Sequence, residues 1–150
     1  VLRSPYARRQ ALVEIDVLMA MNLSASLRQL CEVYRTQFYV LGQNEADTWY
    51  DSLGRIVFTN SRGLSGVGLN RTGKKGDKSP CWEDVKHMSE EAGYTGTDPI
   101  TQIVEDDTLP GGPRKKTITY HPPWVRCDRE RDYEIAWAHF SKRFGLEGHS

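Results

Sequence analysis

A tight β-hairpin that runs into a glycine-rich segment constrains the fold of this chain more than any other feature. Residues 48–50 and 55–59 read as two strands joined by a turn at 51–54, where Gly54 supplies the positive φ that such a turn requires. Beyond the hairpin, glycines alternate with apolar residues: Gly63, Leu64, Gly66, Val67, Gly68 and Leu69. Since apolar side chains anchor a backbone at intervals, we expect an ordered extension of the hairpin rather than a free linker.

Helical patterns precede the hairpin. Ser4 and Pro5 form a typical helix start, and apolar residues cover more than half of the circumference of the helix predicted over residues 6–21. We therefore expect this first helix to be largely buried. Arg8 and Arg9 are interpreted as part of a solvated face, with contact to a phosphate group as the alternative.

A second helix is predicted to begin at Ser24 or Ser26 and to continue to about Phe38. Two helices with so short a connection have the outline of a helix-turn-helix DNA reader, although most such pairs are packing units, which is the interpretation we favour. Cys31, on the apolar side of the second helix, is expected to be a small core residue rather than a nucleophile.

The chain turns basic after the glycine-rich segment. Asp77 is the only acidic residue within 62–78, which carries five cations: Arg62, Arg71, Lys74, Lys75 and Lys78. The phosphate-loop spacing G-x-x-x-x-G-K-[S/T] does not occur here. Two interpretations of this segment remain, a solvated surface loop and a loop that grips phosphates without reading sequence.

The second half of the chain repeats the mixture of helix and hairpin. A Ser79–Pro80 opening predicts a short helix over 81–92, on which His87 is expected to be a surface imidazole rather than a metal ligand. Strands are predicted at 100–104 and 114–120, and a final helix over 129–144 follows the cap Asp128. We expect the charges of the second hairpin to pair across its turn: Glu105, Asp106 and Asp107 with Arg114, Lys115 and Lys116.

Composition limits the functional classes. The 150 residues carry 20 Lys and Arg against 20 Asp and Glu, so the net charge alone gives no reason to expect a nucleic acid partner. Three cysteines without a C-x-x-C spacing indicate reduced thiols, and no apolar run approaches the roughly 18 residues of a membrane span, so we expect a cytoplasmic protein with no membrane partner. The length predicts a single domain, and the start at Val1 without Met suggests a piece of a longer polypeptide.

The tetrapeptide His121-Pro122-Pro123-Trp124 has the shape of the Asp/Asn/Ser-Pro-Pro-aromatic motif of amino-directed DNA methyltransferases. His stands where that motif needs an acceptor side chain, and no strand-then-glycine cofactor loop precedes it. We interpret it as the end of a strand rather than as a catalytic motif. No other nucleophile, metal or phosphate-binding pattern is found, so the sequence predicts no catalytic residue, no metal site and no cofactor in this chain.

Several longer stretches carry a resemblance to a known family: SPYARRQALVEIDVLMAMNLS, LCEVYRTQFYVLGQNEADTWYDSLGRIVFT, GLSGVGL and RCDRERDYEIAWAHFSKRFG. They resemble the C-terminal region of large actinobacterial proteins, the Eco57I-like adenine-specific DNA methyltransferases of restriction-modification and phage defence. The resemblance implies a region that accompanies a methyltransferase, with S-adenosylmethionine and the catalytic motifs on the parent protein. It implies DNA and the remainder of the parent methyltransferase as partners.

Together these observations predict an α+β fold of two N-terminal helices, a central hairpin with its glycine-rich extension, a short helix, a second hairpin and a C-terminal helix. Six aromatic residues are expected to share one core: Trp49, Tyr50, Phe58, Trp124, Trp137 and Phe140. The leading hypothesis is a non-catalytic DNA-binding or target-recognition module. It grips the DNA backbone through the basic segment, with Arg114, Lys115 and Lys116 as auxiliary contacts. The alternative is a protein-interaction or structural docking domain that does not contact DNA.

Overall fold

The structure, a computed structural model, describes residues 3–60, 67–73, 75–108 and 110–146. The chain forms two compact units, each described here by itself. The helical unit joins the segment that ends at Asp47 to the segment that begins at Cys127, and the strand-containing unit spans residues 48–126. Helices and two small antiparallel sheets make the fold α+β, as the sequence predicts. That the chain is one domain of a longer protein stays a prediction.

The helical unit contains α1 (Pro5–Asn22), α2 (Leu27–Gln37), α3 (Tyr39–Ala46) and α5 (Arg129–Phe144). Three of these helices begin at caps that the sequence predicts. Ser4 Oγ accepts a hydrogen bond from the Ala7 amide, Ser26 forms a reciprocal capping box with Gln29, and Asp128 accepts bonds from two amides of α5. The sequence predicts no helix between Phe38 and the hairpin, so α3 is an element that was missed.

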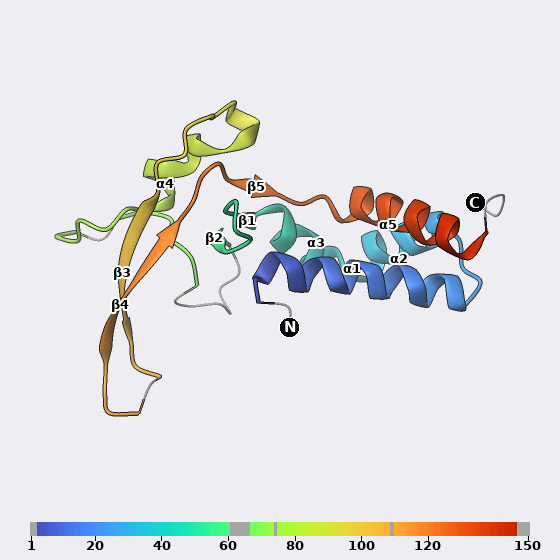
Figure 1. Cartoon of the computed structure of the whole chain (residues 1–150), viewed down its shortest axis with the longest axis horizontal. Coiled ribbons are helices and arrows are strands. Elements are labelled where there is room, and N and C mark those ends of the chain that lie inside the picture. Colours follow the sequence, from blue (N-terminus) through green and yellow to red (C-terminus); the bar gives the residue numbers. More distant parts are fainter. Residues whose placement is uncertain (1–2, 61–66, 74, 109, 147–150) are drawn as a thin grey trace. The chain divides into compact units, whose positions relative to one another are not determined.

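The core of the helical unit lies where α1 packs against α2 and α5 (Figure 1). Its buried residues come from these three helices: Val13, Val17, Ala20, Cys31, Tyr133, Trp137 and Phe140. Cys31 is a core residue, as expected. The expectation of a largely buried first helix is wrong, because one side of α1 remains open, with Leu12, Ile15 and Met19 each more than half exposed.

The strand-containing unit begins with the predicted hairpin of β1 (Trp49–Tyr50) and β2 (Ile56–Phe58). Its turn is organised by Asp51, which is 2% exposed. One carboxylate oxygen accepts bonds from the Leu53 and Arg55 amides, and the other accepts a bond of 3.1 Å from the His121 amide. Gly54 has the expected positive φ of 79°. A further strand, β5 (Val125–Arg126), pairs with β1 to give the order β2-β1-β5.

The second hairpin is a two-stranded ribbon of β3 (Ile100–Asp106) and β4 (Arg114–Tyr120), which extends beyond the rest of its unit (Figure 1). The strand β3 runs two residues past the predicted end. The register sets Glu105 opposite Lys115 and Asp106 opposite Arg114. The register thus aligns two of the three cations with carboxylates, as expected, while Lys116 lies opposite Val104 and Asp107 lies beyond the end of β3. Within the described part of the chain, none of these residues forms an ion pair with another.

The helix predicted over 81–92 is wrong in its start and its continuity. The helix α4 (Trp82–Val85) has Cys81 rather than Ser79 as its N-terminal cap, and two 3₁₀ turns, η1 (Lys86–Met88) and η2 (Glu90–Ala92), follow it. Ser89 between these turns is extended because the backbone there bonds to Trp124, whose amide donates to Met88 O at 2.9 Å. A contact distant in sequence thus overrides the local helical pattern.

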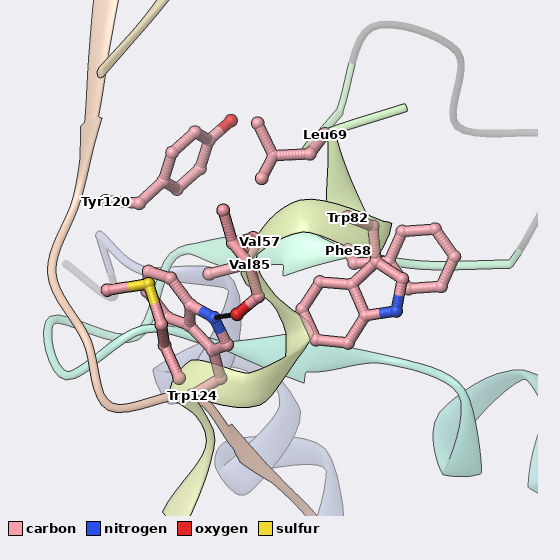
Figure 2. Packing of buried hydrophobic residues seen from close by; sticks show 8 residues of the cluster. Val57, Phe58, Leu69, Trp82, Val85, Tyr120 and Trp124 are labelled. Carbon is pink, nitrogen blue, oxygen red and sulfur yellow. Dashed lines mark hydrogen bonds between the residues drawn. The ribbon is translucent and has the colours of Figure 1, made fainter. Parts of the chain in front are cut away.

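A second hydrophobic cluster fills the strand-containing unit (Figure 2). Its buried members come from β2, α4, β4 and the segments beside them: Val57, Phe58, Leu69, Trp82, Val85, Met88, Tyr120 and Trp124. The indole of Trp124 is fully buried and donates a hydrogen bond of 2.8 Å to the Val85 carbonyl. The prediction of one shared aromatic core is wrong, because Trp137 and Phe140 belong to the separate cluster of the helical unit.

The helices of the structure can be compared with the expectation that the chain contains no membrane-spanning segment. Within residues 3–60, 67–73, 75–108 and 110–146, no helix has the length and the apolar character needed to cross a lipid bilayer.

Candidate functional site

The basic segment of the strand-containing unit, residues 70–78, is attached to the core through the residues on either side of it. The Leu69 amide donates to the Val57 carbonyl at 2.7 Å, and the Trp82 amide donates to the Asn70 carbonyl at 2.8 Å. Leu69 itself is buried, so this part of the predicted glycine-rich extension is anchored as expected. The expectation is wrong for Val67, which is 40% exposed. The third predicted anchor, Leu64, and the glycines Gly63 and Gly66 lie outside the described residues.

The cations of this segment differ in what they contact. Lys75 and Lys78 are exposed, and within the described part of the chain neither lies in an ion pair. Arg71 instead contacts its own unit, since its guanidinium lies 5.2 Å from the centre of the Phe58 ring and donates to Asn60 Oδ1 at 2.9 Å. Arg62 and Lys74 lie outside the described residues.

The three cations of the ribbon face a mixed electrostatic surrounding. Arg114 and Lys115 lie opposite Asp106 and Glu105, whereas Lys116 lies opposite Val104. Hydrogen bonds from Thr108 hold the pKa of Asp106 below its ordinary value, so that carboxylate is ionised at neutral pH. Acidic charge therefore offsets much of the positive charge at this end of the ribbon.

The structure does not gather the predicted contact residues into one patch. Lys75 and Lys78 lie on the loop before α4, and the ribbon cations lie near the far end of β3 and β4, so the two sets occupy different ends of the unit (Figure 1). The described cations therefore occupy two separate positions, the loop before α4 and the ribbon.

A cluster of buried charges in the helical unit was not predicted. Arg129 donates from Nε to Glu45 at 3.0 Å and from Nη1 to Asp16 at 3.0 Å, and its Nη2 forms a further bond to Glu45. Arg9 pairs with Asp132 at 2.5 Å and lies 3.5 Å from Glu45. Both arginine side chains are only 6% exposed, so the interpretation of Arg9 as a solvated or phosphate-contacting residue is wrong.

The groups around this cluster are held in single protonation states at neutral pH. Burial raises the pKa of Glu45, but the hydrogen bonds and charge of Arg129 outweigh it and hold that pKa below its ordinary value. Burial and the neighbouring Glu45 raise the pKa of Tyr34 to about 12. Burial raises the pKa of the Cys127 thiol to about 11, which leaves little thiolate for reaction. The arrangement suits a structural role in joining α1, α3 and α5.

One sequence signal pointed to this cluster. Arg9 lies on the same face of α1 as the buried Val13 and Val17, and Arg129 shares a face of α5 with Tyr133 and Trp137. A charged residue that continues an apolar helical stripe must be paired if that stripe is buried. The partners were not predictable in this way, since Arg129 and Asp16 are 113 residues apart in sequence.

The helical unit also carries an apolar groove between α1 and α2. Its volume is about 450 Å³, and its walls include Leu12 and Met19 from α1, Leu23 just after α1, and Leu30 and Val33 from α2. Asp16 and Arg129 are the charged residues along it. We call this feature the apolar groove. Sequence analysis missed it because an apolar stripe indicates which face avoids water, not what covers that face.

The other predicted positions are accounted for by packing. His87 is exposed and its ring meets the edge of Tyr94 at a centroid distance of 6.2 Å. The His-Pro-Pro-Trp segment connects β4 to β5 and delivers Trp124 to the core. Among the described residues, no group of three or more His, Cys, Asp and Glu side chains is arranged to hold a metal ion.

Comparisons with known proteins assign no family. No protein-family model, curated protein or solved structure matches the chain.

Proposed function

We propose that this chain is a non-catalytic accessory module of a DNA methyltransferase, and that its strand-containing unit contacts the DNA backbone through the loop carrying Lys75 and Lys78. The observation that carries the proposal is the exposure of these two lysines, without an ion pair among the described residues, on a loop whose ends are hydrogen-bonded to the core. Lysines in this setting gain free energy by releasing counterions from phosphates, and they do so without reading the base sequence.

The ribbon is an auxiliary contact in this proposal. Lys116 lies opposite Val104 across the strands, although its charge also acts on Asp106, whereas Arg114 and Lys115 lie directly opposite carboxylates and contribute less. The resemblance of the sequence to adenine-specific DNA methyltransferases supports DNA as the polyanion. In that setting, the cofactor and the methyl-transfer chemistry belong to the parent protein.

The test is the binding of a fluorescently labelled DNA duplex to the full chain, followed by anisotropy over a series of salt concentrations. The double variant Lys75→Glu and Lys78→Glu should weaken binding and reduce the slope of log affinity against log salt by about 2, since each phosphate contact contributes roughly 0.9. The matched control, Lys142→Glu with Arg143→Glu at the end of α5, changes the net charge equally and should change binding little.

Two outcomes would refute this role. One is an unchanged salt slope in the Lys75 and Lys78 variant. The other is an equal loss of binding in the control, which would show that only total charge matters.

A second function, interaction with another protein, is favoured by a different observation. The apolar groove leaves large side chains open to solvent, with Leu23 71% and Leu12 54% exposed, on a chain without net charge. Monomeric soluble proteins rarely expose large contiguous apolar surface, and where such surface occurs it often marks a site of interaction with another protein. Such a role needs no contact with DNA.

A further inference from the structure

The apolar groove has the dimensions of a helix-binding site. Leu12 and Met19 on α1 and Leu23 at its C-terminal cap follow one another at i, i+7 and i+11, and they form a stripe of about 16 Å at a rise of roughly 1.5 Å per residue. Leu30 and Val33 on α2, at i and i+3, form the opposite wall. Two helices that present parallel apolar ridges accept a third helix between them, with its side chains in the spaces between theirs.

The exposure of these residues shows how much of the groove is open. Met19 is 52% and Val33 47% exposed, and Phe38 at the end of α2 is 49% exposed. These side chains sit on helices that are capped and packed on their other sides, so their exposure does not follow from loose local structure. An occupant would bury apolar surface without requiring the unit to unfold or repack.

The charges along the groove determine the chemistry of an occupant. Arg129 is 7% exposed and its hydrogen bonds go to Asp16 and Glu45, so it has little capacity for a further partner. The Asp16 side chain is 41% exposed, and its Oδ2 accepts bonds from Arg129 and from the Tyr133 hydroxyl. Its Oδ1 has no hydrogen bond among the described residues. The groove therefore offers an occupant a partly exposed carboxylate oxygen, which favours a cation.

We propose that the apolar groove binds an amphipathic α-helix of a protein partner, with apolar residues spaced at i, i+4, i+7 and i+11 and with a Lys or Arg that meets Asp16. This proposal rests on the second of the two functions above, protein interaction, and is independent of DNA binding. The apolar side chains supply the affinity, and the cation fixes the direction and register of the helix.

The helix α3 of a second copy fits this description less well. The helix α3 exposes Tyr39 and Val40, at 64% and 67%, but its eight residues contain no Lys or Arg to meet Asp16. It also spans only about 12 Å at roughly 1.5 Å per residue, which is shorter than the stripe on α1. A separate partner helix is thus favoured over α3 of a second copy. The open side of α1 in a second copy, with Leu12, Ile15 and Met19, is the occupant that the sedimentation measurement below tests.

The experiment uses two labelled synthetic peptides of about 16 residues, each with leucines at positions i, i+4, i+7 and i+11. One carries lysines beside the leucines and the other carries glutamates, and anisotropy measures the binding of each to the full chain. The lysine peptide should bind at least about tenfold more tightly, because only it can pair with Asp16. General charge attraction does not produce this difference, since the net charge of the chain is zero.

Variants locate the binding. Met19→Glu places a charge in the groove at an exposed position and should reduce binding of the lysine peptide by about tenfold or more. Leu53→Glu, at a 67% exposed position in the turn of the strand-containing unit, is the matched control and should leave it unchanged. Asp16→Asn should bring the affinities of the two peptides closer together. Circular dichroism of each variant checks that its helical content is unchanged.

Four results would overturn the proposal: no binding of either peptide, equal binding of both, equal effects of Met19→Glu and Leu53→Glu, or a dimer in sedimentation that Met19→Glu abolishes. The last would identify a second copy of this chain as the occupant. Failure of the DNA proposal is separate, because the Lys75 and Lys78 variant should retain peptide binding and Met19→Glu should retain DNA binding.

Discussion

Gly68 controls how the chain returns to the core after β2. Its φ is +74°, and a Cβ atom at this position would lie 2.6 Å from the Val57 carbonyl oxygen. The same carbonyl accepts the hydrogen bond from Leu69 that anchors the basic segment. A larger residue would thus meet both an unfavourable backbone conformation and a fixed neighbouring backbone atom.

We predict that Gly68→Ala lowers the free energy of unfolding by about 2–4 kcal/mol, since positive φ and a backbone clash each cost of the order of 1–3 kcal/mol. Urea denaturation followed by tryptophan fluorescence measures the change. Gly76→Ala, with a φ of +86° and open space around the position, isolates the cost of the backbone conformation, and Gly73→Ala should have little effect. A Gly68→Ala variant no less stable than Gly76→Ala would contradict the steric argument.

At the scale of elements, buried ion pairs join helices that are far apart in sequence. Arg129 on α5 contacts Asp16 on α1 and Glu45 on α3, and Arg9 connects α1 to Asp132 on α5. Such a cluster contributes modestly when complete, but removing one partner leaves charge that is poorly solvated. The positions of α1, α3 and α5 therefore depend on the ionisation of the carboxylates.

We predict that the stability of the helical unit falls as the pH falls below about 4.5, the ordinary pKa of a Glu side chain. The pKa of Glu45 is lower in the folded chain, so its ionisation favours folding above that pH, and the contribution is lost as the pH falls through the folded-state pKa. Glu45→Gln should cost about 3 kcal/mol at pH 7 and clearly less at pH 3. Urea denaturation followed by circular dichroism at both values measures this.

The control for this prediction is Glu32→Gln, which removes an exposed carboxylate from α2. Its stability should follow the wild-type chain at both pH values. If Glu45→Gln lowers stability by the same amount at pH 7 and pH 3, the lowered pKa of Glu45 does not contribute to the stability of the unit.

At the scale of the whole molecule, the chain contains two units with a hydrophobic cluster each. The strand-containing unit is continuous in sequence, whereas the helical unit is assembled from the two segments on either side of it. Three of the four tryptophans, Trp49, Trp82 and Trp124, lie in the strand-containing unit, and Trp137 lies in the helical unit. Spectroscopy can therefore follow the units separately.

We predict that the two units unfold in separate transitions. In Trp137→Phe, tryptophan fluorescence reports only the strand-containing unit, while circular dichroism at 222 nm reports chiefly the helical unit. Because Trp137 is 8% exposed in the helical core, its truncation should lower the dichroism midpoint in urea by the equivalent of about 1–3 kcal/mol and leave the fluorescence midpoint unchanged. Val57→Ala in the same background should do the reverse. Midpoints that move together in both variants would show a single cooperative unit.

The basic segment shows how far the candidate site followed from sequence. The concentration of positive charge at Lys75 and Lys78 was visible as a run of like charges. The sequence did not show that Arg71 stacks on Phe58, nor that the register sets Lys116 opposite Val104 rather than opposite a carboxylate. The residue type indicates that a charge is present, but its availability depends on neighbours that the fold brings to it.

Interactions that span only a few residues were determined by the sequence alone. Ser4 and Asp128 cap their helices through amides within three residues, and Gly54 and Gly145 end a turn and a helix because their backbones tolerate positive φ. These features depend on local sterics and hydrogen bonds, so they do not require knowledge of the rest of the chain.

Features that depend on distant contacts were decided only by the tertiary structure. Trp124 interrupts the helix predicted around Ser89. Arg129 is buried in ion pairs with Asp16 and Glu45, and the aromatic residues separate into two clusters. An apolar or charged pattern states what a face requires, namely burial or a partner, and leaves open which segment provides it. Long-range packing makes that choice, because it sets which side chains meet and which, like Met19, remain open to another molecule.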